Sequence, residues 1–418
     1  MNSKTITIIG AGLYGCLTAW KLKNKFKNYQ INLIDSSDHI LSSYDAIKIR
    51  GNLYNNGFHG LELPRAEGLY NFFQKTAGIP MIKFINEKKL LIEGNLIDYT
   101  FRLKEYPIEI KKFFVKKPNN IIEKFEDFFD YISNDYKLIL KKISSRYCEN
   151  VKDCYHFLVP WFFPSDYFLK SSDEGYLFRD QVRSKKISPS YAAPKSFIFK
   201  SIQEPFLKKL KLIGVNILLN TKVDIDDSGI FYQHDNKKFF LTKEDRVFFC
   251  NSPVNILKFK SLDTFKLLTN NSRILINVII EVQELLGSKE FTEILCADSR
   301  FFRLSRISKI FKKKSQENTK LQLEIFAKPD YKMAEINKEI ENYFLNYFVK
   351  FNFKFIKILG VHSSRTVFFP ENNIIDTANN IVNSWNKNFP SFHILESFGP
   401  INMSKAWTYS EKSLSCIK

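Results

Sequence analysis

The first 35 residues carry the pattern that most limits how this chain can fold. Gly10, Gly12 and Gly15 stand at G-x-G-x-x-G spacing, directly after the β-rich apolar run TITII of residues 5–9. A helical pattern of apolar residues follows them, and a second apolar run at residues 30–34 ends at Asp35. The order strand, glycine-rich turn, helix, strand and acid predicts a βαβ unit that binds a dinucleotide. The alternative is an ordinary βαβ unit with a glycine-rich turn.

Each glycine of the turn has its own physical role. Gly10 allows the tight turn out of the strand, and Gly12 has no Cβ, so the backbone can approach a pyrophosphate. Gly15 lets the helix pack close to the sheet. These roles predict a phosphate-binding turn at residues 10–15.

The residues around this turn complete the expected site. The helix N-terminus, at Leu13 and Tyr14, offers free N–H groups and a partial positive charge to phosphates. Asp35 can accept hydrogen bonds from ribose hydroxyls, and we expect Ser36 beside it to contact the same ligand.

Composition limits the class of protein and its partners. The chain has 418 residues, of which 44% are hydrophobic, and this predicts a globular protein of about two domains. The net charge of +19 favours anionic ligands, nucleic acid or an anionic membrane surface, although part of it reflects a general richness in Lys, Ile and Asn. Since no nucleic-acid-binding motif accompanies the charge, we expect an anionic small molecule and no nucleic acid.

The cysteines and the start of the chain predict a cytoplasmic protein without a metal. None of the six cysteines forms a C-x-x-C pair, and no histidine stands at zinc-finger spacing from a pair, so we expect ordinary thiols. The first strand begins at residue 5, which leaves no room for a signal peptide. No apolar run reaches the ~18 residues of a membrane span.

Residues 104–147 predict a helical subdomain with one apolar face, formed by residues such as Phe125, Phe129 and Ile132. We expect that face to pack internally, because Asp and Glu share the polar face with Lys. The alternative is a peripheral contact with a membrane surface through Lys111, Lys112, Lys116 and Lys117.

The stretch from residue 154 to 186 combines aromatic residues, prolines and basic residues. Arg179 and Arg183 stand four residues apart, so on a helix they share a face and can clamp a phosphate or carboxylate. A solvated basic face is the equally weighted alternative. Trp161 can stack on a uracil ring, whereas packing in a core is the commoner role of such aromatics.

The later part of the chain returns to the pattern of the first. A helix at 198–212 leads to apolar runs at 215–219 and 246–251, which resume the nucleotide-binding sheet. The runs at 274–282, 293–296, 300–304 and 321–326 predict a second sheet. We therefore expect an α/β fold in which a Rossmann-type FAD-binding domain (1–100, 196–255 and 361–418) is interleaved with a helical and substrate subdomain (101–195) and a mixed substrate-domain sheet (256–360).

Several short motifs make the chain resemble the FAD-dependent amine oxidase superfamily, and above all the UDP-galactopyranose mutases and the protoporphyrinogen-oxidase-like proteins. These motifs are the glycine turn with Asp35, the triplet Asp38-His39-Ile40, Asn56-Gly57-Phe58-His59, Arg179-Asp-Gln-Val-Arg183, DSRFFRLSR at 298–306, and the segment from Gly399 onward. Where the family usually has two glycines after His-Ile, this chain has Leu41-Ser42-Ser43. Where it usually has Gly-Arg in the closing segment, this chain has Gly399-Pro400.

The resemblance implies FAD as the cofactor and assigns roles to individual residues. It implies cofactor contacts from the turn and Asp35, and further contacts from Gly57, Phe58, Val223, Gly399, Asn402 and Met403. It places His59 beside the flavin, although packing in a glycine-rich loop is the alternative. It implies that Arg303 faces flavin and substrate, with Arg306 as a second candidate, and that Arg179, Arg183 and Trp161 bind substrate.

The same resemblance implies three functions that differ in class. The first is a flavoenzyme acting on a nucleotide sugar, such as a UDP-sugar used for surface-polysaccharide synthesis. The second is an FAD-dependent oxidoreductase of the amine oxidase or protoporphyrinogen oxidase type. The third is a nucleotide-binding protein without turnover, which Leu41-Ser42 in place of the glycines favours.

Overall fold

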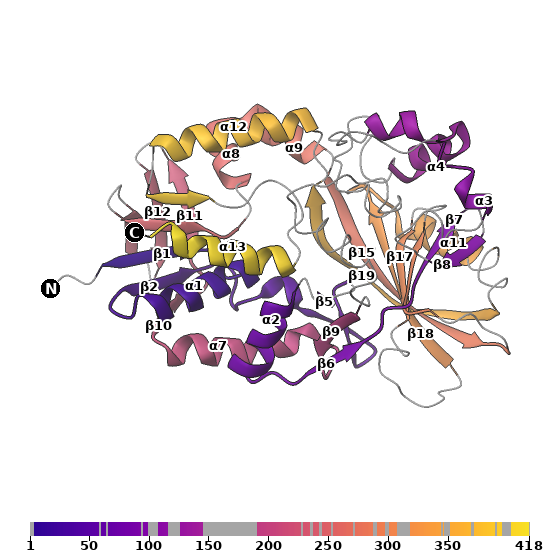
Figure 1. Cartoon of the computed structure of the whole chain (residues 1–418), viewed down its shortest axis with the longest axis horizontal. Helices are drawn as coiled ribbons and strands as arrows, with labels where there is room; N and C mark the ends of the chain where they lie inside the picture. The colour runs from indigo at the N-terminus through magenta and orange to yellow at the C-terminus, as the bar shows by residue number, and fades with distance from the viewer. Residues whose placement is uncertain are drawn as a thin grey trace.

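The computed structural model describes the chain in separate stretches. They are residues 4–57, 60–63, 66–92, 95–98, 108–115, 126–144, 190–226, 229–234, 237–241, 245–251, 254–270, 272–286, 291–296, 301–306, 318–343, 346, 352–368, 372–388, 391–394 and 403–417. Two large sheets dominate them, one on the left and one on the right of Figure 1.

The first large sheet is parallel and draws its five strands from three distant parts of the chain. Its order is β10 (Val215–Leu218), β2 (Gln30–Ile34), β1 (Thr5–Ile9), β14 (Arg246–Phe249) and β20 (Phe392–Ile394). All four neighbouring pairs are parallel. Parallel strands are buried on both faces, and the polar residues Thr7 of β1 and Asn32 of β2 are accordingly buried as well, at 2% and 7% exposed.

Different elements cover the two faces of this sheet. Ile6 and Ile8 of β1 belong to a hydrophobic cluster with helices α1 (Leu13–Lys25) and α7 (Gln203–Leu212). Ile9 and Phe249 point the other way, into a cluster with helices α8 (Val254–Lys260), α9 (Leu262–Asn270) and α12 (Asn372–Asn388). A three-stranded antiparallel sheet joins that second cluster; its strands are β11 (Lys222–Asp226), β12 (Gly229–His234) and β13 (Lys237–Leu241).

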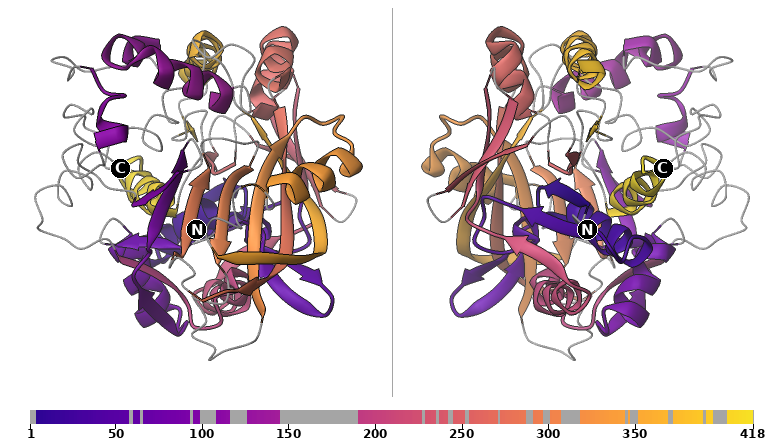
Figure 2. Two further views of the ribbon diagram at one scale, coloured as in Figure 1. Left: turned by 90° about the vertical axis from the view of Figure 1, so that its right-hand side faces the viewer. Right: turned by 90° about the vertical axis from the view of Figure 1, so that its left-hand side faces the viewer.

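The second large sheet has seven strands and mixed directions. Its order is β19 (Phe353–Phe368), β15 (Ser272–Glu284), β18 (Asn318–Ala327), β17 (Phe301–Arg306), β16 (Glu293–Cys296), β7 (Lys88–Ile92) and β8 (Asn95–Asp98). Only β16 and β7 pair in parallel among these neighbours. Helix α11 (Met333–Tyr343) packs against one face, which is apolar (Figure 2).

Short elements join the two large sheets. The hairpin of β3 (Ala46–Ile49) and β4 (Asn52–Asn55) packs on Ile279 of β15. A small sheet contains β5 (Leu61–Leu63), β9 (Ser190–Pro194) and β6 (Met81–Phe84). Helix α2 (Glu67–Asn71), the π-helical turn η2 (Phe72–Thr76) and the 3-10 turn η8 (Phe199–Ile202) pack in the cluster that covers one face of the parallel sheet.

Within the stretch predicted as a helical subdomain, the described residues (108–115 and 126–144) form short, separate elements. Its described elements are α3 (Ile108–Lys111), the 3-10 turn η4 (Glu126–Tyr131) and α4 (Asn134–Ser144). An isolated bridge between Phe114 and Ile132 interrupts the helical path before α4, and the rings of Phe113 and Tyr136 stack there at 5.1 Å. The predicted internal packing of the apolar face holds for these residues.

The fold class predicted from the sequence is confirmed. Strands after residue 214 rejoin the sheet built by β1 and β2, and the runs expected for a second sheet all form strands of one. The sequence reading missed the long strand β19 and the place of the β7–β8 hairpin in that sheet. The five domain segments proposed from the sequence stay predictions.

Candidate functional site

The glycine-rich turn has the geometry that its spacing predicts. Gly10 has a φ of +104°, and its N–H donates a 2.8 Å hydrogen bond to the carbonyl of Ile34. A Cβ on Gly15 would lie 1.8 Å from the Gly10 carbonyl oxygen. Because any side chain at Gly15 would collide with backbone, this glycine is required for the contact between α1 and the sheet.

Gly12 differs from its neighbours because the space beside it is open. A Cβ built there would meet nothing within 4 Å. Gly12 precedes α1, a helix of 13 residues with no acidic side chain in its first turn, so the N–H groups at Leu13 and Tyr14 carry the positive end of the helix dipole. An open, electropositive helix N-terminus fits the pyrophosphate of a dinucleotide.

Asp35 orders the turn through its carboxylate. One oxygen accepts the N–H of Ala11 at 2.5 Å, and the other accepts the N–H of Ser37 at 2.8 Å. Each oxygen keeps further acceptor capacity for a ribose hydroxyl. Ser36, between Asp35 and Ser37 in the sequence, is exposed.

The strand-to-strand connection after β10 borders the same acid. Thr221 donates its N–H to the carbonyl of Asp35 at 2.8 Å, and Asn220 donates to the carbonyl of Ser37 at 2.9 Å. Val223 follows on β11, opposite Tyr232. The structure therefore brings the predicted contact residue Val223 to the Asp35 side of the turn.

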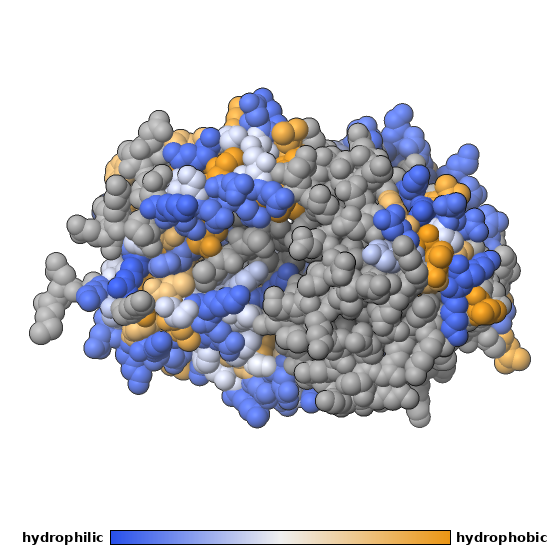
Figure 3. Space-filling model, turned by 45° about the horizontal axis from the view of Figure 1, so that its top comes forward, coloured by the Kyte–Doolittle hydropathy of each residue, from blue (hydrophilic) through white to orange (hydrophobic). Residues whose placement is uncertain are grey.

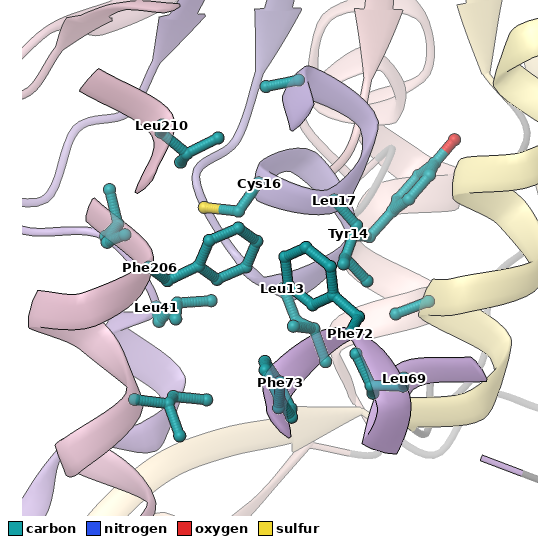
Figure 4. Close-up of a cluster of buried hydrophobic side chains, with 14 of the residues drawn as sticks. Leu13, Tyr14, Cys16, Leu17, Leu41, Leu69, Phe72, Phe73, Phe206 and Leu210 are labelled. Carbon is teal, nitrogen blue, oxygen red and sulfur yellow. The ribbon is translucent and has the colours of Figure 1, made fainter. Parts of the chain in front are cut away.

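The loop after β2 is fastened at Leu41, where the family usually has glycine. Leu41 has φ 57° and ψ 33°, in the left-handed region, and its N–H donates to the carbonyl of Ala11 at 2.8 Å. Its side chain is 0% exposed and lies in the cluster of Figure 4 with Phe206 and Leu210. The buried side chain of Leu41 therefore helps to hold this loop over the turn, whereas a glycine at the same position would have no side chain to bury.

Polar contacts fasten the same loop at its surface. His39 lies between two carboxylates: Nδ1 contacts Asp38, and Nε2 is 2.9 Å from Asp45. Burial alone would lower the pKa of His39, but the two aspartates outweigh it and raise the pKa above its ordinary value. Gln203 at the start of α7 donates to the carbonyl of Leu41 at 3.1 Å and to Asp45 at 3.0 Å.

The C-terminal helix α13 (Met403–Ser415) packs along α1 (Figure 1). Tyr14 has its ring 5.8 Å from that of Tyr409 and its hydroxyl 3.4 Å from that of Ser413. Met403, predicted as a flavin contact, begins the helix and is partly buried. The closing segment therefore returns to the helix that follows the glycine turn.

A second contact between α1 and α13 centres on Lys21. Its ammonium lies 3.6 Å from the centre of the Trp407 ring and 3.4 Å from the carboxylate of Glu411. Burial lowers the pKa of Lys21 to about 8, although Glu411 acts in the opposite direction. A Cβ on Gly68 would lie 2.6 Å from the indole nitrogen of Trp407, so this glycine makes room for the ring.

The segment that carries Gly57 lies on the polar face of the seven-stranded sheet. Asn277 of β15 donates to the Asn56 side chain at 2.9 Å, and Gln322 of β18 donates to the Asn55 carbonyl at 2.9 Å. Gly57 has a φ of +94°, and a Cβ there would stand 3.5 Å from the carboxylate of Glu324. The sheet thus presents amide and carboxylate groups to this segment.

Arg303 lies on this polar face and is held by two carboxylates. Its Nε and Nη2 donate to Glu324 at 2.9 and 2.7 Å, and its Nη1 donates to Glu293 at 3.4 Å. Glu293 also accepts the Asn86 amide at 2.9 Å and lies 3.7 Å from the Lys88 ammonium.

Both ionised forms in this group are favoured by their neighbours. Burial raises the pKa of Glu293, but Lys88 and Arg303 outweigh it and bring the pKa below its ordinary value. Burial would lower the pKa of Arg303, but Glu324 and Glu293 outweigh it and raise the pKa above its ordinary value. The guanidinium is therefore permanently charged and neutralised locally.

Arg306 lies on the opposite face of β17. Along a strand, side chains alternate between faces, so Arg306 shares a face with Leu304 and not with Arg303. It contacts Glu284 and stands 5.9 Å from the centre of the Phe353 ring, within the apolar cluster under α11. Arg303 and Arg306 therefore do not reach the same ligand.

Several predicted site residues lie outside the described stretches, namely Phe58, His59, Trp161, Arg179, Arg183, Gly399 and Asn402. Sequence reasoning missed Glu293 and Glu324. Glu324 could have been found, because Gln322 and Glu324 are polar at a spacing of two within the otherwise apolar strand LQLEIF.

The described residues contain neither a metal-binding cluster nor a membrane-spanning helix. No group of three or more His, Cys, Asp or Glu side chains in these stretches could hold a metal ion. None of the described helices combines the length and the apolar character needed to cross a bilayer. On the face drawn in Figure 3, the described surface is mainly hydrophilic, with hydrophobic residues in smaller groups.

Comparison with known proteins agrees with this architecture. Residues 8–76 match the family of NAD(P)-binding Rossmann-like domains. No curated protein sequence matches the chain.

Solved structures match over nearly the whole chain. A protein assigned as a protoporphyrinogen oxidase, from Exiguobacterium sp. 255-15, aligns over 99% of this chain and 100% of its own, with a TM-score of 0.67 and 13% identity. Reduced UDP-galactopyranose mutase aligns over 99% and 95%, with a TM-score of 0.68 and 12% identity. Putrescine oxidase bound to putrescine aligns over 99% of both chains, with a TM-score of 0.63 and 11% identity. The chain has the fold that these proteins share.

Proposed function

We propose that the chain is an FAD-dependent enzyme that binds the cofactor across the glycine-rich turn. The observation that carries this proposal is the open space at Gly12 before α1, next to the carboxylate of Asp35. Leu13, Tyr14 and Ser36 would contact the same ligand. A bound flavin would supply the redox chemistry, and the residues of the chain would hold and orient it.

The reaction would take place where the Gly57 segment meets the polar face of the seven-stranded sheet. Gly57, Phe58 and His59 would line the flavin, together with Val223 on the nucleotide side and Gly399, Asn402 and Met403 in the closing segment. Arg303 would face the same space from β17. This assignment agrees with the resemblance to the amine oxidase superfamily and with the position of the Glu324 carboxylate, 3.5 Å from where a Cβ on Gly57 would lie.

The first candidate substrate is a nucleotide sugar, such as a UDP-sugar used for surface-polysaccharide synthesis. The similarity to UDP-galactopyranose mutase over nearly the whole of both chains supports it. Arg179 and Arg183 would hold the diphosphate, Trp161 would stack on the base, and Arg306 is the second arginine of the motif. Since Arg306 lies under α11, Arg303 is the better candidate of that pair.

The second candidate is an oxidoreductase that acts on a substrate without a phosphate. The specific observation in its favour is that the guanidinium of Arg303 already donates hydrogen bonds to Glu324 and Glu293. An arginine that is paired in this way offers less to an anionic substrate than one without carboxylate partners.

Absorbance of the purified protein tests the cofactor. We expect flavin bands after expression or after addition of FAD, with FAD identified by mass spectrometry of the released ligand. If the folded protein takes up no FAD, both enzyme proposals fail, and a nucleotide-binding protein without turnover becomes the conclusion.

Turnover separates the two candidate substrates. The nucleotide-sugar proposal predicts conversion of UDP-galactopyranose by the dithionite-reduced enzyme. Absence of conversion, with reduction of oxygen or a dye by amine substrates, would assign the chain to the oxidoreductase class.

A further inference from the structure

The strongest unassigned feature of the molecule is the ion-pair group on the polar face of the seven-stranded sheet. Glu324 and Glu293 are both 2% exposed, and Glu324 lies beside the segment that carries Gly57. Buried carboxylates cost free energy unless paired, so their retention here requires the contacts with Arg303.

The two carboxylates hold Arg303 unequally. Glu324 takes Nε and Nη2 in the forked geometry that is the strongest arrangement of arginine and carboxylate. Glu293 takes Nη1 at the longer distance of 3.4 Å and is shared with Asn86 and Lys88. Glu324 is therefore the residue that fixes the direction of the guanidinium.

Glu324 also lies beside Gly57, on the proposed substrate side. Its carboxylate lies 3.5 Å from the position of a Cβ on Gly57, and the Arg303 side chain keeps 18% of its surface exposed. A ligand lying over Gly57 would meet a guanidinium that a carboxylate has already neutralised. A phosphate or carboxylate brought to Arg303 would have to displace Glu324 or accept repulsion from it.

We infer that Glu324 is a specificity-determining residue that positions Arg303 and disfavours anionic groups at this end of the substrate site. The inference rests on the proposed function only in taking the polar face beside Gly57 as the substrate side. With Glu324 in place, we expect a diphosphate group of a substrate to bind to residues other than Arg303.

The test measures binding of inorganic pyrophosphate by isothermal titration calorimetry to protein preincubated with FAD. The variants are Glu324→Gln, which keeps the shape of the side chain but removes its charge, and Glu284→Gln as a matched control. Glu284, at the end of β15, pairs with Arg306, which lies on the opposite face of β17 from Arg303. We expect Glu324→Gln to bind pyrophosphate at least about tenfold more tightly than the wild type, and Glu284→Gln to bind as the wild type does.

A double variant, Glu324→Gln with Arg303→Met, identifies the site of binding. The double variant should lose the increase in pyrophosphate affinity that Glu324→Gln shows. If the pyrophosphate bound at the glycine turn instead, replacing Arg303 would leave that affinity unchanged. This difference does not depend on flavin uptake, which absorbance reports separately, so failure of the cofactor proposal and failure of this inference are distinguishable.

Two results would overturn the inference. One is tight binding by the wild type that Arg303→Met abolishes, because Arg303 would then accept anions despite Glu324. The other is a folded Glu324→Gln variant with unchanged affinity. If that variant does not fold, the wild type and Arg303→Met carry the test: equal pyrophosphate affinities are expected, and a clearly lower affinity of Arg303→Met overturns the inference.

Discussion

The backbone N–H of Leu41 donates a 2.8 Å hydrogen bond to the carbonyl oxygen of Ala11, so the loop after β2 is tied to the glycine-rich turn. Leu41 makes this bond from the left-handed region, at a φ of 57°, while its side chain is fully buried. Backbone conformation and side-chain burial thus impose opposite preferences on one position.

Substitution of Leu41 should reverse the usual order of alanine and glycine. Both Leu41→Ala and Leu41→Gly lose the buried side chain, which costs about 2–5 kcal/mol of unfolding free energy. Glycine also relieves the left-handed backbone, which is worth about 1 kcal/mol. Urea unfolding should therefore find Leu41→Gly more stable than Leu41→Ala. The opposite order would show that the loop can leave the left-handed conformation when the side chain is removed.

The sequence predicted the parts of this site that local patterns encode. The turn, Asp35 and the late strands of the parallel sheet follow from glycine spacing and apolar runs within short windows. The pairing of Glu293 with Lys88 in parallel strands has no local signal, because the two residues are brought together only by the complete sheet. For the same reason the pairing of Glu293 and Glu324 with Arg303 could not be foreseen, although the polar spacing of Gln322 and Glu324 is visible in the sequence and DSRFFRLSR itself was recognised.

Leu41 illustrates a second limit on prediction. The absence of the family's glycines at this position was visible in the sequence and favoured the hypothesis of a nucleotide-binding protein without turnover. The structure retains the left-handed backbone with leucine, because Phe206 and Leu210 of α7 supply a core for its side chain. That compensation comes from a helix distant in sequence, so no reading of the loop alone could reveal it.

Alanine at Gly12 and at Gly15 should have opposite effects on stability and cofactor binding. Gly15→Ala places a Cβ 1.8 Å from the Gly10 carbonyl, and we expect a loss of about 3 kcal/mol or more of unfolding free energy. Gly12→Ala meets open space, so its unfolding free energy should change by less than about 0.5 kcal/mol. Its affinity for FAD should nevertheless fall at least about tenfold, because the methyl group takes the space that a phosphate approaches.

Urea unfolding and titration with FAD, followed by fluorescence, measure the two effects. The pair controls for itself, since both variants add the same methyl group within one turn. A Gly12→Ala variant that binds FAD as the wild type does would remove the main support for a pyrophosphate at this position.

Lys21 should make the attachment of α13 stronger as pH rises above 8. The pKa of Lys21 in the folded chain is about 8, below the ordinary value of 10.5. Between these values the unfolded chain binds a proton that the folded chain does not, so stability rises with pH by up to about 1.4 kcal/mol per pH unit. Lys21→Met keeps the apolar stem near Trp407 and cannot titrate. The difference in unfolding free energy, wild type minus Lys21→Met, should therefore increase between pH 8.5 and 9.5.

A second variant tests the cause of that increase. Glu411 raises the pKa of Lys21, so Glu411→Gln should shift the rise in stability to lower pH. Guanidinium chloride unfolding of the three proteins at several pH values gives the comparison. Parallel pH profiles for wild type and Lys21→Met would show that the ammonium is not desolvated against α13.

His39 should stabilise its loop in acid and lose that effect as pH rises. The folded-state pKa lies above the ordinary 6.5 because Asp38 and Asp45 outweigh burial. A raised histidine pKa contributes stability that is fully present below pH 6.5 and disappears as pH rises through the folded value. His39→Gln removes the titration, and since His39 is partly exposed the effect should stay below about 1 kcal/mol. Urea unfolding at pH 6 and pH 9 measures it, and a wild-type advantage that grew with pH would contradict the proposed pairing with the two aspartates.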